Sequence, residues 1–218
     1  LGVERFLVDK IPIINSLDTH TIVNIAGSKI DDYVETMKIL ESSSGNHIGY
    51  EINISCPNVK EGGIEFGVSP LITEDLTKRL RKLTDKLLIM KLSPNVTSIA
   101  DIAIASEQGG ADAVSAINTL VGMGIDIYNS KSRLSTVFGG LSGPAIKPVA
   151  LAHVHKIYNS VSIPIIGIGG IQCVDDIIEF ILAGADLVRI SVPDEDSLTA
   201  FAKIKAKSKI KTFGKLQW

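Results

Sequence analysis

The chain has 218 residues, of which 45% are apolar and 5% aromatic, and its formal net charge is −2. This length is sufficient for one large domain with a substantial core, and the near-neutral charge gives no electrostatic argument for binding nucleic acid. Two cysteines are too few for a disulfide framework, no apolar run reaches membrane-spanning length and no signal peptide is evident, so we expect a cytoplasmic protein without a membrane segment.

Short apolar segments rich in Ile, Val and Leu alternate along the chain with segments of helical character. The predicted strands are residues 21–27, 48–55, 87–92, 113–117, 164–168 and 186–190. The predicted helices are residues 31–42, 69–85, 97–108 and 174–183, with a further helix inside 143–160. Strands that alternate with helices throughout a chain predict a parallel sheet.

Two architectures contain such a sheet, and polar residues at the strand ends distinguish them. A doubly wound sheet favours a G-x-G-x-x-G turn after its first strand, and this chain has none. A β/α barrel instead places polar residues after successive strands. They occur here at Asn24, Asn53, Cys56, Lys91, Asn95, Asn118 and Thr119, and the glycines Gly169 and Gly170 follow a further strand.

Side chains from separate strand ends meet only if the sheet curls, so we predict an α/β protein with a TIM-type (β/α)8 barrel. A closed barrel of this type has eight strand–helix units, and about six are recognisable in this sequence. We therefore expect residues 1–218 to be one barrel domain that is incomplete at its N-terminus, with the other units upstream of Leu1. Lysines without intervening acids make residues 203–218 a basic C-terminal tail or helix; a solvated end or a patch for an anionic partner would explain them.

The run from Glu51 to Asn58 carries the most specific chemical signal. It ends a predicted strand with the thiol of Cys56, which is flanked by the amides of Asn53 and Asn58. Amides can hold a flat polar ring, and a thiol with a reference pKa of about 8.5 can transfer a proton near neutral pH. The alternative interpretation is a small buried structural cysteine.

Other strand ends carry weaker signals, each with a structural alternative. Gly169 and Gly170 lie between a strand and a helix, where backbone N–H groups bind phosphate or a tight turn requires glycine. Lys91 ends a strand and either meets an anion or an electron-rich ring, or extends to solvent. Asn118 and Thr119 fit a ring-binding pair or a helix cap.

The segment 139–144 is predicted to be a glycine-rich loop that either approaches a flat cofactor or makes a turn. His153 and His155 lie two apart on a helix and do not share a face, so we interpret them as structural and predict no metal site.

Several of these motifs together resemble a known family. The segments are 53–63 (Asn-Ile-Ser-Cys-Pro-Asn-Val-Lys-Glu-Gly-Gly), 91–97 (Lys-Leu-Ser-Pro-Asn-Val-Thr), 117–120 (Ile-Asn-Thr-Leu), 139–148 (Gly-Gly-Leu-Ser-Gly-Pro-Ala-Ile-Lys-Pro) and 164–171 (Pro-Ile-Ile-Gly-Ile-Gly-Gly-Ile). Their order and spacing over about residues 3–190 resemble the dihydroorotate dehydrogenase family, in particular its NAD-linked class 1B catalytic subunit.

The resemblance implies an FMN-containing barrel that oxidises (S)-dihydroorotate to orotate in pyrimidine biosynthesis. It implies that Cys56 is the base that removes the C5 proton, while hydride passes to FMN. The residues that it implies for the pyrimidine are Asn53, Asn58, Asn118 and Thr119, and those for FMN are Asn24, Lys91, Ile117, Ser142, Gly143, Gly169 and Gly170. It further implies a partner subunit with FAD and an iron–sulfur cluster, and a homo-oligomeric core.

Two departures from the family pattern keep alternatives open. Nothing before Leu1 supplies the family's first two strands, and Ser191-Val192 stands where the family has a Gly-Thr pair at the flavin phosphate. A truncated or degenerate barrel without catalysis is therefore one alternative. The flavin domain of dihydropyrimidine dehydrogenase is another, although its cysteine loop resembles this chain less, because it carries His where this chain has Asn58.

Overall fold

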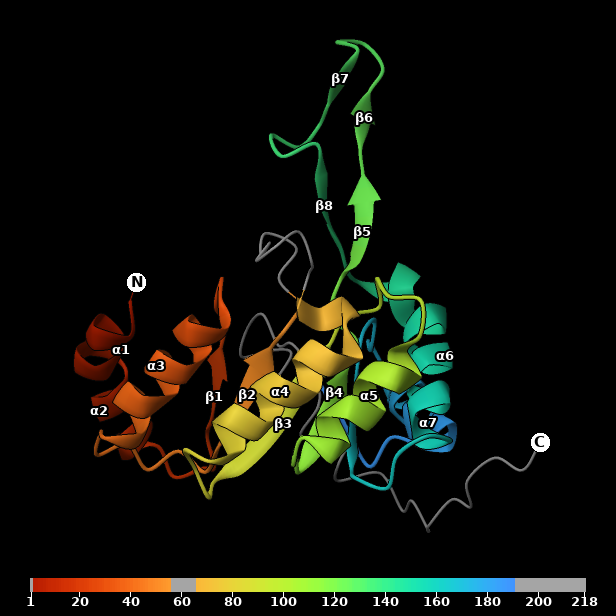
Figure 1. Ribbon diagram of the computed structural model, residues 1–218. Helices are drawn as coiled ribbons and strands as arrows, with labels where there is room; N and C mark the ends of the chain where they lie inside the picture. The colour runs from red at the N-terminus through yellow and green to blue at the C-terminus, as the bar shows by residue number, and fades with distance from the viewer. Residues whose placement is uncertain (1, 56–65, 191–218) are drawn as a thin grey trace.

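The computed structural model describes residues 2–55 and 66–190 (Figure 1). Cys56, Asn58, Ser191, Val192 and the basic segment 203–218 lie outside the described residues. Six parallel strands form one sheet in the order β1-β2-β3-β4-β9-β10. They are β1 (Ile22–Ile25), β2 (Gly49–Asn53), β3 (Leu87–Leu92), β4 (Ala113–Ala116), β9 (Ile165–Ile168) and β10 (Leu187–Arg189), so every predicted strand is confirmed.

Helices cover one face of this sheet, and successive helices pack side by side. They are α3 (Ile30–Glu41), α4 (Pro70–Arg81), α5 (Ile99–Gln108), α6 (Lys147–Tyr158) and α7 (Val174–Ala183), preceded by the short α1 (Val3–Asp9) and α2 (Ile11–Ser16). Single 3-10 turns, η1 (Phe66–Val68) and η2 (Pro144–Ile146), precede α4 and α6. Because each strand is followed by a helix on the same face, the sheet curls as part of an α/β barrel, as predicted.

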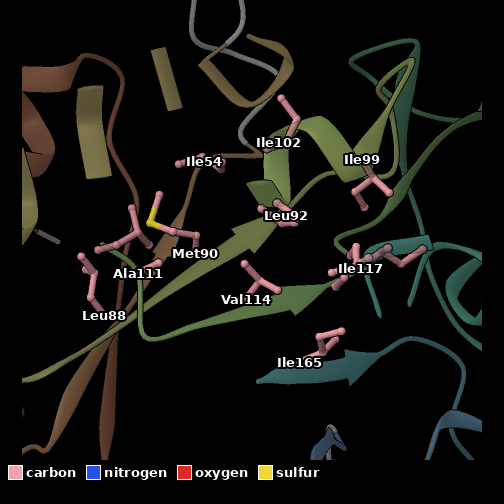
Figure 2. Packing of buried hydrophobic residues seen from close by; sticks show 14 of the residues in the cluster. Ile54, Leu88, Met90, Leu92, Ile99, Ile102, Ala111, Val114, Ile117 and Ile165 are labelled. Carbon is pink, nitrogen blue, oxygen red and sulfur yellow. The ribbon is translucent and has the colours of Figure 1, made fainter. Parts of the chain in front are cut away.

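The core lies between the helices and the outward face of the sheet (Figure 2). Alternate strand residues such as Ile52, Met90 and Val114 are fully buried there. Gly167 belongs to the same layer, and a Cβ at this position would lie 2.5 Å from Phe180 of α7, so glycine allows the helix to approach. The other alternate residues face the barrel interior, where Ile22 and Leu187 on the two edge strands are 45% and 60% exposed.

A two-stranded arm projects from the carboxyl edge of the sheet after β4 (Figure 1). It pairs β5 (Leu120–Met123) with β8 (Phe138–Leu141), and β6 (Ile125–Asp126) with β7 (Lys131–Ser132), both antiparallel. The prediction of a loop at 139–144 was therefore wrong for its first residues, because Gly139 and Gly140 pair with Gly122 and Val121. The arm exposes apolar side chains, among them Ile127, Tyr128 and Phe138.

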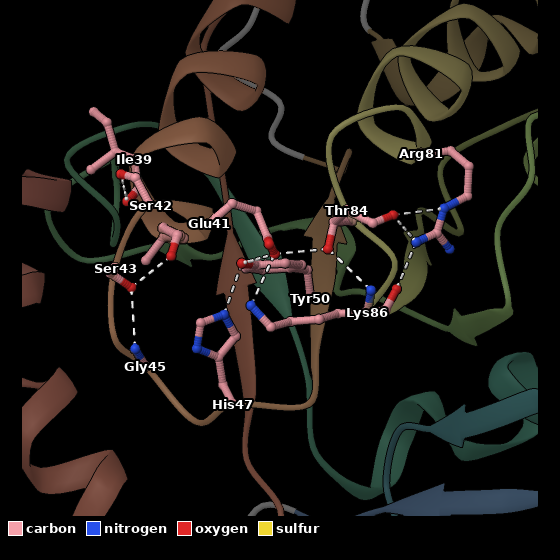
Figure 3. Close-up of polar contacts among 11 residues, drawn as sticks. Ile39, Glu41, Ser42, Ser43, Gly45, His47, Tyr50, Arg81, Thr84 and Lys86 are labelled. Carbon is pink, nitrogen blue, oxygen red and sulfur yellow. Dashed lines mark hydrogen bonds and ion pairs between the residues drawn. The ribbon is translucent and has the colours of Figure 1, made fainter.

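A polar network ties α3 to the amino edge of the sheet (Figure 3). Glu41 Oε1 accepts hydrogen bonds from Tyr50 Oη (2.6 Å), Thr84 Oγ1 (2.7 Å) and Lys86 Nζ (3.0 Å). Burial alone raises the pKa of Glu41, but these hydrogen bonds and the Lys86 charge hold it below its ordinary value of 4.5. The carboxylate therefore stabilises the fold in its charged form.

We expect Glu41→Gln to lower the free energy of unfolding by about 2 kcal/mol at pH 7, because charge-assisted hydrogen bonds are lost. The folded-state pKa is depressed, so the stabilisation is fully present above about pH 4.5 and is lost as the pH falls through the lower folded-state value. Urea unfolding of both proteins across this range should show the difference shrinking with acid. A difference that is constant down to pH 3 would contradict this assignment.

Candidate active site

The carboxyl edge of the sheet brings together polar side chains from separate strands. Asn118, which follows β4, donates from Nδ2 to Oδ1 of Asn53 at the end of β2 over 3.0 Å. The Oδ1 atom of Asn118 accepts the Thr119 N–H (2.8 Å), and the Asn53 carbonyl accepts the Tyr33 hydroxyl (2.9 Å). Two of the three asparagines predicted to hold a ring, Asn53 and Asn118, are therefore in contact and are oriented by their neighbours.

A cavity of about 440 Å³ lies beside this pair. Its lining includes the predicted residues Lys91, Ile117, Asn118, Thr119, Ser142, Gly143, Gly169 and Gly170. The volume lies in the range of about 300–1,000 Å³ that is typical of small-molecule sites.

Among the described candidates, Asn53 and Asn24 do not line this cavity: Asn53 contacts its lining residue Asn118, whereas Asn24 lines a different cavity. That cavity, of about 520 Å³, is the barrel interior between the edge strands, and Asn24 Nδ2 donates there to Glu51 Oε2 (2.6 Å). No contact with the first cavity supports the prediction that Asn24 binds the flavin, so its predicted role stays untested.

The glycines at the far wall of the first cavity have a backbone requirement. Gly143, Gly169 and Gly170 have φ values of +85°, +131° and +74°. A Cβ at Gly170 would lie 2.9 Å from the Gly143 carbonyl oxygen and 3.0 Å from the Lys147 nitrogen. The strand-to-helix turn therefore packs backbone against backbone, which gives a ligand close access to main-chain atoms.

The amino end of α7, next to this turn, already has its own carboxylate. Asp176 Oδ2 accepts the N–H groups of Gln172 (2.7 Å) and Cys173 (3.0 Å), and its Oδ1 pairs with Lys147 Nζ (2.6 Å). The hydrogen bond from Lys147 and those from the two amides hold the pKa of Asp176 below its ordinary value. A phosphate at Gly169 and Gly170 therefore has to bind amides other than these two.

Lys91 lies at the boundary of the cavity, and its ammonium has no ion-pair partner within the described part of the chain. Burial lowers its pKa; the Glu51 charge opposes this effect and the Arg189 charge adds to it, so the net shift is downward. A partly buried cation that faces a cavity is suited to an anionic or electron-rich group of a ligand.

Sequence reasoning missed Glu51 and Arg189. Glu51 is only 6% exposed and lies on the inward face of β2, two residues before Asn53. An acidic residue in the middle of an apolar strand is the signal that would have indicated it. The long stem of Arg189, in the last strand, extends to Glu51.

A curled parallel sheet with a cavity and polar side chains at the carboxyl ends of its strands defines the class of protein: a β/α barrel whose site lies at the usual catalytic face. A family model described as dihydroorotate dehydrogenase matches residues 2–210. The chain belongs to the dihydroorotate dehydrogenase family, as its motifs predicted.

Individual relatives agree with this assignment. The chain is 51% identical over 189 residues to "Dihydroorotate dehydrogenase B (NAD(+)), catalytic subunit" of Alkaliphilus metalliredigens, which covers 87% of this chain and 62% of the relative. It is 48% identical to the protein of the same name from Bacillus mycoides, with coverage of 87% and 61%. The chain thus spans about three fifths of the length of these relatives.

A solved structure, a DHODH from Eimeria tenella in complex with ferulenol, is similar in fold. It has a TM-score of 0.66 and 21% identity, over 94% of this chain and 60% of that one. At this identity the likeness concerns the fold alone.

We expect Gly170→Ala to lower the free energy of unfolding by about 1–3 kcal/mol, because the positive φ and the two backbone contacts disfavour a Cβ. Gly122→Ala in the arm is the matched control, since its Cβ would meet only ordinary contacts from 3.4 Å outward. Urea unfolding of both variants measures the difference, and equal stabilities would contradict the strained turn.

Proposed function

We propose that the protein is the barrel part of an FMN-dependent dihydroorotate dehydrogenase, which oxidises (S)-dihydroorotate to orotate in pyrimidine biosynthesis. The observation that supports this most directly is the contact between Asn53 and Asn118 beside a cavity lined by Lys91 and the Gly169–Gly170 turn, in a chain of this family. The names of the curated relatives support the reaction.

The described residues fit FMN in two respects. Ser142, Gly143, Gly169 and Gly170 line the cavity without a large side chain, and a Cβ at Gly143 would meet no atom within 4 Å, so a phosphate and its chain could lie along them. The Lys91 ammonium, unpaired within residues 2–55 and 66–190, suits the pyrimidine edge of the flavin, where negative charge develops on reduction. Ile117 would contribute an apolar wall to the same cavity.

When bound, FMN supplies the acceptor for the hydride from C6 of dihydroorotate. The substrate ring would be held by amide hydrogen bonds from Asn53, Asn58 and Asn118 and by the Thr119 hydroxyl. Cys56 would act as a thiolate and take the C5 proton onto its sulfur, because its thiol comes three residues after Asn53 in the sequence. Lys91 would hold the oxidised ring in place and stabilise the reduced anion through its charge.

The relatives are named catalytic subunits, which supports a partner subunit. We propose an electron-transfer subunit with FAD and an iron–sulfur cluster, and a homo-oligomeric core. No helix among the described residues is long and apolar enough to cross a membrane. A cytoplasmic location stays a prediction from the low cysteine content.

The purified chain, reconstituted with FMN, should be yellow, and anaerobic dihydroorotate should bleach the flavin absorbance. Colourless protein after reconstitution would contradict the enzyme function for this chain and favour the degenerate barrel. Bleaching by dihydrouracil but not by dihydroorotate would favour the alternative of a dihydropyrimidine dehydrogenase domain.

We expect Cys56→Ala to retain orotate binding but to slow flavin reduction by about 10²–10⁴-fold, the usual contribution of a general base. Stopped-flow absorbance under anaerobic conditions measures this rate. Cys173→Ser is the matched control, because Cys173 is exposed at the start of α7 and serine can retain its cap. Equal reduction rates in the Cys56 variant and the wild type would refute the base assignment.

A further inference from the structure

One carboxylate inside the barrel gathers side chains from three other strands. Glu51 of β2 accepts hydrogen bonds from Asn24 of β1 (2.6 Å), from Ser115 of β4 (2.9 Å) and from Arg189 of β10 (2.6 Å). Both carboxylate oxygens are used: Asn24 and Arg189 bind Oε2, and Ser115 binds Oε1. A carboxylate that is 7% exposed at its side chain needs such partners to remain charged.

Glu51 lies between two cations on the inward face of the sheet. Arg189 reaches it from β10, and Lys91 is placed two residues further along β3 than Ile89, the register partner of Glu51. Burial raises the pKa of Glu51, but the charges of Arg189 and Lys91 and the hydrogen bonds from Ser115 and Arg189 hold it below its ordinary value. No other acidic or basic side chain lines either cavity within the described residues.

The two cations compete for one anion, and the geometry shows which of them has it. Arg189 and Lys91 both line the cavity beside Gly143, Gly169 and Gly170, but Arg189 forms the ion pair at 2.6 Å and Lys91 forms none in the described segments. A lysine beside an unclaimed carboxylate would turn toward it, because a direct ion pair satisfies both buried charges.

We propose that Arg189 is a positioning residue: its ion pair with Glu51 keeps that carboxylate from Lys91, so that the Lys91 ammonium stays directed at the flavin. The inference rests on the proposed function for the identity of the ligand. The predicted position of Lys91 is independent of the proposed function and can be tested without flavin.

Arg189→Gln leaves Glu51 without its cation, so Lys91 pairs with Glu51 and leaves the cavity. We expect FMN to bind about 10- to 100-fold more weakly, the effect of losing one charge-assisted hydrogen bond, measured by quenching of flavin fluorescence. The double variant Glu51→Gln/Arg189→Gln removes the competing anion as well and should restore FMN affinity to within about threefold of wild type. If Arg189 had only a structural role, the double variant would bind FMN no better than Arg189→Gln does.

Adding Lys91→Met to Arg189→Gln should weaken FMN binding little further, because Lys91 no longer contacts the ligand. Arg189→Lys keeps the charge and should bind FMN nearly as the wild type does. If Arg189→Gln does not fold, the comparison of Glu51→Gln with Glu51→Gln/Arg189→Gln still decides the question. Both should retain FMN affinity, and loss of affinity in the double variant alone would show that Arg189 acts on the ligand directly and overturn the proposal.

A flavin-free readout separates this inference from the proposed function. Acetic anhydride modifies unprotonated, accessible amines, and mass spectrometry of the Lys91 peptide gives its rate of modification at pH 8. Pairing with Glu51 in Arg189→Gln should slow this rate about tenfold, and the double variant should restore it. This pattern in a chain that never binds FMN would refute the proposed function alone. FMN binding with an unchanged Lys91 rate would refute the inference alone.

Discussion

The buried carboxylate of Glu51 is the interaction on which the inner face of the sheet depends. A charge in this environment is tolerated only with partners, and its partners come from β1, β4 and β10. Strands that are far apart in the sheet are thereby held at one point beneath the cavity. The same arrangement sets the charge of the site, because among the described residues Glu51 pairs with Arg189 alone, and the unpaired Lys91 leaves a net positive charge next to the cavity.

The amino edge of the sheet contributes to stability, whereas the carboxyl edge carries the candidate site. At the amino edge, Glu41 is satisfied by Tyr50, Thr84 and Lys86, and this network joins α3 to the strands. At the carboxyl edge, Asn53 and Asn118 bind each other while the adjoining cavity stays open. This division is general for β/α barrels, in which loops at the carboxyl ends of the strands carry the reactive groups. It explains why substitutions at Glu41 and at Cys56 are expected to affect different measurements.

The regular part of the fold could be predicted because each strand is a short apolar run and each long helix carries end signals, as at Ser69-Pro70 and Gly184. The arm could not. Its strands pair only with each other, its glycines indicate a loop, and apolar residues such as Tyr128 face solvent, so no burial pattern marks the pairing of Leu120–Met123 with Phe138–Leu141. The short helices α1 and α2 were missed for a related reason, since Ile11 is the only residue that either one buries.

The sequence predicted the residues of the candidate site that lie at strand ends, but not the contacts between distant strands. Asn53 and Lys91 lie in the last two residues of their strands and Asn118 follows β4, so parallel pairing alone brings them to one edge. The ion pair of Glu51 with Arg189 joins residues 138 positions apart, and neither neighbourhood in the sequence points to the other. The local sequence pattern indicates which face of the sheet a residue occupies. Whether Arg189 or Lys91 pairs with Glu51 depends on distances across the barrel, which the pattern does not give. For that reason Lys91 could be identified as a candidate ligand contact from its strand end, but the ion pair that leaves it free for a ligand became visible only in three dimensions.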